Sequence, residues 1–279
     1  MLILACAPLG NSSDASHRLR EAIESAPYIA AEDSRKLNRL TSDLGIRYTG
    51  KVISYFEGNE LQRIDQLTEI LLTGEDLLVI TDAGAPGVSD PGYRLIQAAI
   101  ENGVAIQVLP GPSAVTTALL LSGLSTDRFC FEGFSPRTSG TRQSWYKKLA
   151  TEERTIVFFE APHRLKESLS DAALNLGSDR RAAICREMTK RYEETIRGTI
   201  SELIEWSSER EILGEITVVL EGFDTFSQIY SNDEIVLRVL AREAAGERRK
   251  DAIATIAKEL NLPKRTVFDA MVDSKAVER

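Results

Sequence analysis

The chain has 279 residues, a formal net charge of −8, 43% hydrophobic residues and 27% charged residues, a composition typical of a soluble globular protein. No apolar run approaches the roughly 20 residues that a membrane span requires, and no signal peptide is recognisable, so we expect a cytoplasmic protein without membrane contacts. Three widely spaced cysteines and two histidines argue against a disulfide framework or a Cys/His zinc site, and no metal site is predicted.

Residues 1–122 alternate short apolar runs with amphipathic segments, which predicts an N-terminal α/β domain with a mostly parallel sheet. The strands are expected at 2–6, 28–32, 51–55, 76–81 and 104–109. After the third strand, Ile64, Leu67 and Leu71 recur at the spacing of one helical face. Gly74 follows as a candidate C-cap, so a helix between the third and fourth strands is predicted.

Residues 123–223 predict a second, C-terminal α/β domain whose sheet is mixed, because strand-like runs follow one another more closely. Its strands are expected at 128–134, 154–162, 181–189, 193–200 and 214–223, and its helices at 141–150, 164–176 and 200–208. The boundary between the two domains is placed at residue 122, where the strand–helix alternation changes.

Residues 224–279 predict a small helical tail with a helix-turn-helix pattern. The first helical face contains Ala252, Ile256 and Leu260, the pattern breaks at Asn261–Leu262–Pro263, and it resumes with Val267, Ala270 and Met271. Such a tail is either a helical cap or a nucleic-acid contact, and the pattern does not decide between them.

Four loops rich in glycine, proline and polar residues fall at the carboxyl ends of the first domain's strands. They are 7–11, 31–35, 81–92 and 109–114. Ligands of open α/β sheets bind beyond these strand ends, so the loops predict one binding site. The sequence has no GxxxxGK[ST], no GxGxxG after the first strand and no GxSxG, which argues against a P-loop, an ordinary dinucleotide site and a serine-hydrolase elbow.

Several motifs together carry a family resemblance. In chain order they read APLGN, AEDSR, SDPGYRL, LPGPSA, SGL, FEGFSPR, EAPHRL, REMTKRYEE and GEITVVLEG, and they span residues 1–223. This set resembles the ribosomal RNA small subunit methyltransferase I family, and the helical tail resembles its C-terminal appendage. The sequence departs from the family at Ala7, where members usually have a threonine before the proline.

The resemblance implies a two-domain tetrapyrrole-methylase fold with S-adenosyl-methionine bound between the domains. It implies methylation of a cytidine ribose 2′-oxygen in the decoding region of 16S ribosomal RNA, with the small ribosomal subunit as partner and a homodimer as the assembly. The apolar run 115–124 fits such an interface or a core. The cofactor contacts carried over by motif are Pro8, Asp82, Ala83, Gly84, Ala85, Val88, Ser113, Ala114, Glu160, Met188, Gly214 and Glu215.

Methylation of a hydroxyl oxygen benefits from a group that takes up the proton, which makes carboxylates and histidine the candidates. The catalytic residues we expect are Asp33, Asp90, His163 and Glu187. Asp82 and Asp90 lie in a Gly/Pro loop, where an aspartate often hydrogen-bonds its own backbone instead. The sequence does not choose among these candidates.

Contacts to RNA need basic and aromatic side chains. The segment 133–151 contains four basic residues and no acidic residue. The residues we expect to bind RNA phosphates are Arg35, Arg137, Arg142, Lys147, Lys148, Arg164, Arg186, Lys190 and Arg191, and those expected to stack a base are Trp145 and Tyr146.

Two other interpretations remain open. One is a methyltransferase of the same fold that acts on a tetrapyrrole precursor or on a protein side chain, as in diphthamide synthesis. The other is a non-catalytic RNA-binding or cofactor-sensing protein, for which cofactor affinity without methyl transfer would be diagnostic.

Overall fold

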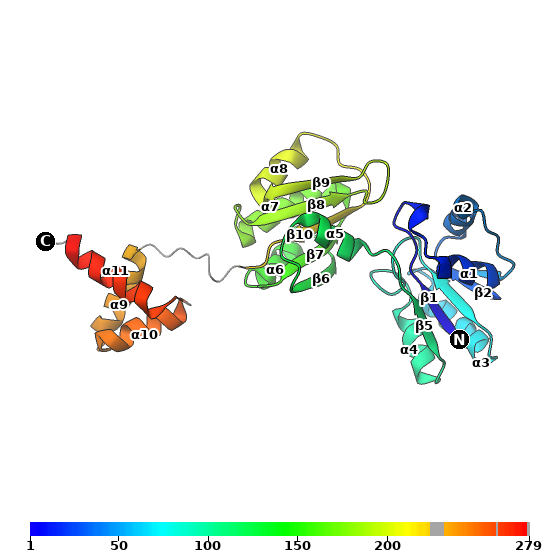
Figure 1. Ribbon diagram of the computed structural model, residues 1–279, viewed down its shortest axis with the longest axis horizontal. Coiled ribbons are helices and arrows are strands. Elements are labelled where there is room, and N and C mark those ends of the chain that lie inside the picture. The colour runs from blue at the N-terminus through cyan, green and yellow to red at the C-terminus, as the bar shows by residue number, and fades with distance from the viewer. Residues whose placement is uncertain (224–231, 261, 278–279) are drawn as a thin grey trace. The chain divides into compact units, whose positions relative to one another are not determined.

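The computed structural model describes residues 1–223, 232–260 and 262–277. The chain forms two compact units, Met1–Glu221 and Gly222–Arg279 (Figure 1). The first unit contains two five-stranded sheets with helices on both faces of each. No helix within the described ranges is long and apolar enough to cross a membrane.

The first sheet has the strand order β3-β2-β4-β1-β5, and all of its strand pairs are parallel. Its strands are β1 (Leu2–Ala5), β2 (Tyr28–Ala31), β3 (Lys51–Ser54), β4 (Leu77–Ile80) and β5 (Ile106–Leu109). Every residue of β1 and β4 is buried, as expected for central strands covered on both faces. The predicted parallel sheet is confirmed.

Two pairs of helices cover opposite faces of this sheet. They are α1 (His17–Ser25) and α2 (Ser34–Leu44) on one face, and α3 (Glu60–Leu72) and α4 (Tyr93–Glu101) on the other. Leu19 and Ile23 of α1 pack against one set of alternate strand residues, and Leu67 and Leu71 of α3 pack against the other set. A short 3-10 helix, η1 (Ser12–Asp14), follows β1.

The second sheet is mixed, as predicted, with the order β6-β7-β10-β8-β9. Its strands are β6 (Phe129–Phe134), β7 (Thr155–Glu160), β8 (Arg181–Arg186), β9 (Glu194–Thr199) and β10 (Ile216–Leu220). The pair β6–β7 is parallel, whereas β7–β10, β10–β8 and β8–β9 are antiparallel. Strand β10 lies in the middle and is buried at every residue.

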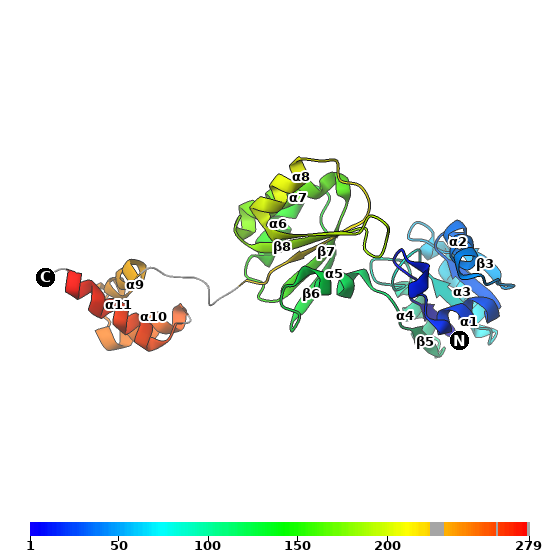
Figure 2. The same ribbon diagram turned by 45° about the horizontal axis from the view of Figure 1, so that its top comes forward.

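Helices also cover both faces of the second sheet, as Figure 2 shows. They are α6 (Ser139–Leu149), α7 (Leu165–Leu176) and α8 (Ile200–Ser208) on one face and α5 (Ala114–Ser122) on the other, with the 3-10 helix η2 (Pro162–Arg164) before α7. Val115 and Leu119 of α5 pack on Val219 of β10. Helix α5, which the predicted boundary assigns to the N-terminal domain, therefore packs on the second sheet. The domain boundary at residue 122 stays a prediction.

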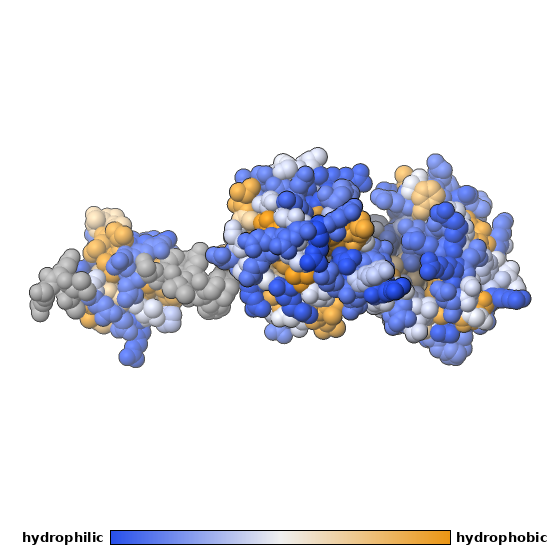
Figure 3. Space-filling model, turned by 90° about the horizontal axis from the view of Figure 1, so that it is seen from above, coloured by the Kyte–Doolittle hydropathy of each residue, from blue (hydrophilic) through white to orange (hydrophobic). Residues whose placement is uncertain are grey.

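The described part of the second unit contains α9 (Asn232–Ala244), α10 (Arg249–Glu259) and α11 (Lys264–Val277). The predicted apolar face is confirmed, because Ala252, Ile256, Leu260, Val267, Ala270 and Met271 are buried in one core. Helix α9 also contributes to that core and was not predicted. Exposed apolar side chains remain on this unit (Figure 3). Asn261, part of the predicted break, lies outside the described residues.

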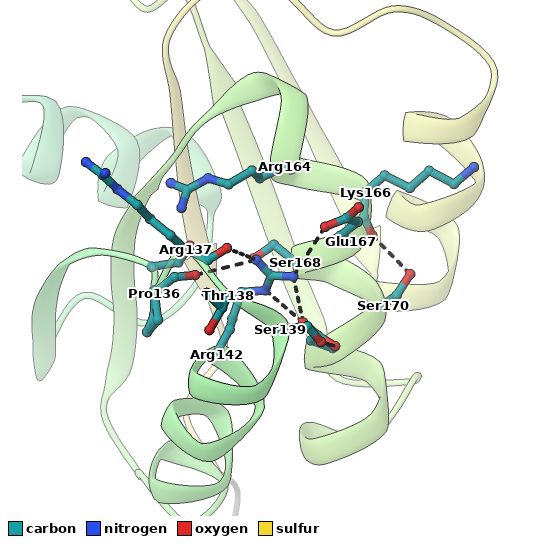
Figure 4. Close-up of polar contacts among 12 residues, drawn as sticks. Pro136, Arg137, Thr138, Ser139, Arg142, Arg164, Lys166, Glu167, Ser168 and Ser170 are labelled. Carbon is teal, nitrogen blue, oxygen red and sulfur yellow. Dashed lines mark hydrogen bonds and ion pairs between the residues drawn. The ribbon is translucent and has the colours of Figure 1, made fainter.

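A buried ion pair joins α6 to α7. The Arg142 side chain is fully buried, its Nε donates to Asp171 Oδ2 at 2.8 Å, and its Nη2 lies 2.7 Å from the same oxygen. Ser139 Oγ and Gln143 Nε2 donate to Asp171 Oδ1. Figure 4 shows the Arg142 guanidinium pointing inward, toward the carbonyl oxygens of Pro136 and Arg137.

Removing one partner of this pair leaves a buried charge uncompensated, which typically costs about 3–5 kcal/mol. Asp171→Ala is therefore expected to lower the midpoint of thermal unfolding by about 6–12 °C, measured by scanning calorimetry. Arg181→Ala, which removes an exposed pair with Glu221, is the control and should shift the midpoint by about 2 °C or less. Equal shifts for the two variants would show that the buried Arg142–Asp171 pair contributes no more to stability than an exposed ion pair.

Candidate active site

One cavity of about 740 Å³ lies at the carboxyl ends of the first sheet's strands and is closed by the second sheet. It is lined by the loops after β1, β2 and β4, the start of α5, the ends of β6 and β7, the loop after β8 and the start of β10. All residues carried over as cofactor contacts line it: Pro8, Asp82, Ala83, Gly84, Ala85, Val88, Ser113, Ala114, Glu160, Met188, Gly214 and Glu215. Their assignment to a cofactor remains a prediction, but they share one site.

The loop 81–92 is shaped by backbone contacts that need glycine. Gly84 N donates to Ala7 O at 3.0 Å and Ala7 N donates to Gly84 O at 2.8 Å. Two backbone hydrogen bonds therefore join this loop to the loop after β1. The pairing uses only the backbone of Ala7, which explains how the loop keeps its shape without a threonine there. Gly92 has φ +142°, and a Cβ on it would lie 3.0 Å from Gly87 N. No other residue fits there without displacement.

The loop after β8 closes the cavity from the second sheet. Asn11 N donates to Thr189 Oγ1 at 3.2 Å, and a Cβ on Gly10 would lie 2.2 Å from Lys190 Cγ. Glu187 and Thr189 have φ values of +51° and +63°, which are uncommon for residues other than glycine. Strained backbone of this kind persists only where neighbouring contacts hold it, and it clusters at functional sites.

Acidic residues gather at the cavity wall near β2 and β4. Glu32 Oε2 accepts from Asp82 N at 3.0 Å, and Asp82 Oδ2 lies 2.9 Å from Lys36 Nζ. Burial and the nearby Asp82 carboxylate raise the pKa of Glu32. Asp90 lines the same wall, and its carboxylate has no hydrogen-bond or ion-pair partner in the parts of the chain that the structure describes.

The pKa of the Asp90 carboxyl lies near neutral pH. Burial first, and then the charges of Glu32, Asp82 and Glu215, raise its pKa to about 7, against a weaker opposing effect of Lys36. Desolvation and neighbouring like charges both disfavour the ionised form. Asp90 therefore exchanges a proton readily near pH 7.

Two other catalytic candidates are held ionised by partners. Asp33 caps α2, accepts from Arg35 N and Nε at 2.8 and 3.0 Å, and its pKa falls to about 2 through these bonds. Burial alone would raise the pKa of Glu187, but Lys190 Nζ at 2.9 Å and Glu215 N at 2.9 Å lower it. Neither carboxylate is well suited to take up a proton at neutral pH.

Glu160 is a fully buried carboxylate in the cavity wall. Its Oε1 accepts from Ala161 N at 2.8 Å and lies 3.1 Å from Arg164 Nη2, and its Oε2 accepts from Ser135 Oγ. His163, the fourth catalytic candidate, is exposed within η2 and does not line the cavity. The structure thus brings Asp33 and Asp90 to the cavity and Glu187 next to it, but not His163.

The residues predicted to bind RNA differ in accessibility. Arg142 is fully buried against Asp171, so its prediction as an RNA contact is wrong, and Tyr146, with no exposed surface, cannot stack a base. Trp145 is half-buried against Phe158. Those with exposed side chains are Arg35, Arg137, Lys147, Lys148 and Arg191, and those partly buried are Arg164, Arg186 and Lys190.

Ion pairs occupy several of the remaining basic residues. Arg35 binds Asp33, Arg186 lies 3.3 Å from Glu194, and Lys190 bridges Glu187 and Glu215. Arg137, Lys147 and Lys148 have no such partner within the described ranges, and they remain the stronger predictions for phosphate contacts.

Some residues of the site are not predicted from the sequence. Lys36 and Glu32 line the cavity and belong to its charge network, and Phe134 lines it with an exposed ring. Lys36 directly follows the 31–35 loop in the first turn of α2, so its position was the available signal. Phe134 gave no signal beyond its place in the FEGFSPR motif.

Comparison with known proteins gives consistent results. A family model described as tetrapyrrole (corrin/porphyrin) methylases matches residues 1–204. Ribosomal RNA small subunit methyltransferase I of Mycobacterium tuberculosis (strain ATCC 25618 / H37Rv) is 46% identical over 275 residues, which covers 98% of this chain and 95% of that protein. The protein of the same name from Bacillus subtilis (strain 168) is 37% identical over 276 residues, covering 97% and 93%.

The fold agrees with a solved methyltransferase. Uroporphyrin-III C-methyltransferase from Thermus thermophilus, crystallised with S-adenosyl homocysteine, superposes with a TM-score of 0.56 at 17% identity, covering 79% of this chain and 96% of that one. The predicted two-sheet fold and the family resemblance are confirmed.

Neutralising Asp90 is expected to stabilise the fold only at high pH. Its folded-state pKa of about 7 exceeds the ordinary value of 3.8, so its contribution to stability is fully present below pH 3.8 and is lost as pH rises through 7. Asp90→Asn should therefore raise the unfolding midpoint at pH 8.5 by about 2–4 °C, with solvent screening included, and by much less at pH 5.

The exposed Asp127 supplies the control, since Asp127→Asn should leave the midpoint unchanged at both pH values. An Asp90→Asn variant less stable than the wild type at pH 8.5 would show that the carboxylate is stabilised rather than strained in the cavity.

Proposed function

Because the chain belongs to the ribosomal RNA small subunit methyltransferase I family, we propose that it transfers a methyl group from S-adenosyl-methionine to the RNA of the small ribosomal subunit. The acceptor that we assign is the ribose 2′-oxygen of a cytidine in the decoding region of 16S ribosomal RNA. The observation that carries the proposal is the convergence of every motif-assigned cofactor residue on one cavity.

The cavity suits this cofactor in size and charge. Its volume of about 740 Å³ falls in the range of roughly 300–1,000 Å³ that small-molecule sites occupy. The backbone of the 81–92 loop and the start of α5 offer hydrogen-bonding groups, and Val88 and Met188 offer apolar contact. The carboxylates of Asp82 and Asp90 complement a cationic ligand. When bound, S-adenosyl-methionine supplies an electrophilic methyl group on a positively charged sulfur.

In this proposal Asp90 accepts the proton that the ribose hydroxyl loses as its oxygen is methylated. A general base works best when its pKa lies near the working pH, and Asp90 has a pKa of about 7. Asp33, with a pKa of about 2, is too weak a base at that pH. His163 would have to reach the cavity from outside its lining.

Lysines moderate the negative charge of the cavity. Lys36 pairs with Asp82 and Lys190 pairs with Glu215, so two of the acidic residues that line the wall are already matched. A site that held the cationic ground state too tightly would slow methyl transfer, because the charge on sulfur disappears in the reaction. Because lysines already neutralise Asp82 and Glu215, Asp90 is the carboxylate whose protonation changes when the ligand binds.

The wider assembly is also part of the proposal. Arg137, Lys147 and Lys148 supply exposed positive charge for RNA phosphates in an otherwise acidic chain. A homodimer is supported by apolar side chains without cover, since Leu120 on α5 is 75% exposed and Val108 on the edge strand β5 is 53% exposed. Action on ribosomes places the enzyme in the cytoplasm.

Methyl transfer to purified small ribosomal subunits tests the function. Subunits from a strain that lacks the enzyme would be incubated with methyl-labelled S-adenosyl-methionine, beside naked 16S RNA and a tetrapyrrole precursor. We expect label on the RNA at one cytidine whose 3′ linkage resists alkali, because a 2′-O-methyl group blocks cleavage. Asp90→Asn should reduce the transfer rate by about 100-fold or more while cofactor binding persists, and Asp127→Asn should match the wild type.

Label on the tetrapyrrole and none on the RNA would contradict the proposal and favour a small-molecule methyltransferase. Cofactor binding without label on any acceptor would favour a non-catalytic cofactor sensor.

A further inference from the structure

One of the residues that line the cavity has an exposed aromatic ring. Phe134, the last residue of β6, lines the cavity and is 58% exposed, and Val88, which lines the same cavity, is 43% exposed. Phenylalanine is among the residues most often buried, and here the exposed ring borders a cavity. None of the roles assigned by motif includes Phe134.

The ring is held in place by the fold. Between Phe131 and Phe134 the register of β6 on β7 shifts, with Gly133 at φ +70°, which is the signature of a β-bulge. A bulge redirects the side chain that follows it. The Phe134 ring packs edge-to-face on Phe159 at 5.3 Å between centroids, and Ser135 N donates to Phe159 O at 3.1 Å. Its orientation is therefore fixed before any ligand binds.

Two arginines follow the ring with unused donors. Arg137 is exposed, and its side chain has no hydrogen-bond or ion-pair partner within the described ranges. Arg164 uses Nη2 on Glu160, whereas its buried Nε and Nη1 have no partner there. Figure 4 shows the two side chains extending to the same side, away from the inward-pointing Arg142. The unpartnered Arg164 nitrogens are buried, so the exposed Arg137 is the arginine that can bind an external anion.

An exposed aromatic face near an unpaired arginine is a combination that recognises unpaired nucleotides. Bases in single strands stack on aromatic rings, and arginines bind the adjoining phosphates. We propose that Phe134 stacks the base of the unpaired target nucleotide while Arg137 binds a flanking phosphate. The inference rests on the proposed function and names the substrate subsite of that same cavity. Phe134 and Asp90 line the same cavity, so the proposal sets the sugar of that nucleotide toward Asp90.

Substitutions at Phe134 separate stacking from other roles. Phe134→Ala should lower kcat/KM for labelled methyl transfer to small subunits by about 10- to 100-fold, the loss expected for one base–aromatic stack. Phe134→Trp should restore transfer, and Phe134→Leu, which keeps apolar bulk without a π face, should not. Cofactor affinity, measured by calorimetry, should stay at the wild-type value in all three. Leu174→Ala, at a 76% exposed site on α7, is the control.

Wild-type transfer by Phe134→Ala, or by Phe134→Leu, would overturn the proposal. A parallel loss of cofactor affinity would also overturn it, because Phe134 would then be a wall of the cofactor site.

Direct binding of a short single-stranded oligoribonucleotide, measured by fluorescence anisotropy at several salt concentrations, tests the subsite independently of catalysis. Phe134→Ala should weaken binding, and Arg137→Gln should reduce the slope of log affinity against log salt by about 0.7, the value for one phosphate contact on a single strand. If the wild type methylates no RNA but Phe134→Ala still weakens binding, the proposed function fails and the subsite stands. Equal binding by wild type and Phe134→Ala would overturn the subsite.

Discussion

Mutual repulsion among partly buried carboxylates is the constraint on which the site depends. Glu32, Asp82 and Glu215 all raise the pKa of Asp90, and burial adds the largest contribution. A fold does not gather like charges in a cavity without a compensating partner, because both desolvation and repulsion oppose it. Lys36 and Lys190 supply part of that compensation. A cationic ligand supplies the rest, which ties the electrostatics of the cavity to the chemistry of methyl transfer.

Contacts between the two sheets hold this charge arrangement in place. Glu187 N donates to Glu215 O at 3.0 Å, which holds the loop after β8 beside Glu215, and the same loop packs on Gly10 and Asn11 of the loop after β1. On the other side of the cavity, Ser89 Oγ would lie 3.8 Å from a Cβ on Gly133 of β6. Ser89 in the 81–92 loop, and Glu187 and Thr189 in the loop after β8, have left-handed backbone conformations. Local strain there is offset by the packing of one sheet against the other.

Much of the fold and the position of the cavity were predictable because they follow from local sequence, whereas the cofactor contacts came from the family resemblance. The alternation of apolar runs and amphipathic helices indicates the parallel sheet, and the Gly/Pro loops fall at its carboxyl edge. Residues whose role depends on tertiary packing were not predictable. Arg142 lies in a basic, acid-free segment but is buried by Asp171 from α7, which is 29 residues away. Phe134 lies at a β-bulge of β6, and the sequence does not show where its ring points.

The central claim is that Asp90 senses the charge of the ligand in this cavity, and calorimetric titration tests it most directly. S-adenosyl-methionine has a cationic sulfur and S-adenosyl-homocysteine a neutral one. A cation near Asp90 lowers its pKa, so binding of the methionine form should release a proton below pH 7 and tighten as pH rises from 6 to 8. The homocysteine form should show a weaker dependence, and Asp90→Asn should remove the difference. The same pH dependence for both ligands, in wild type and variant alike, would contradict the account.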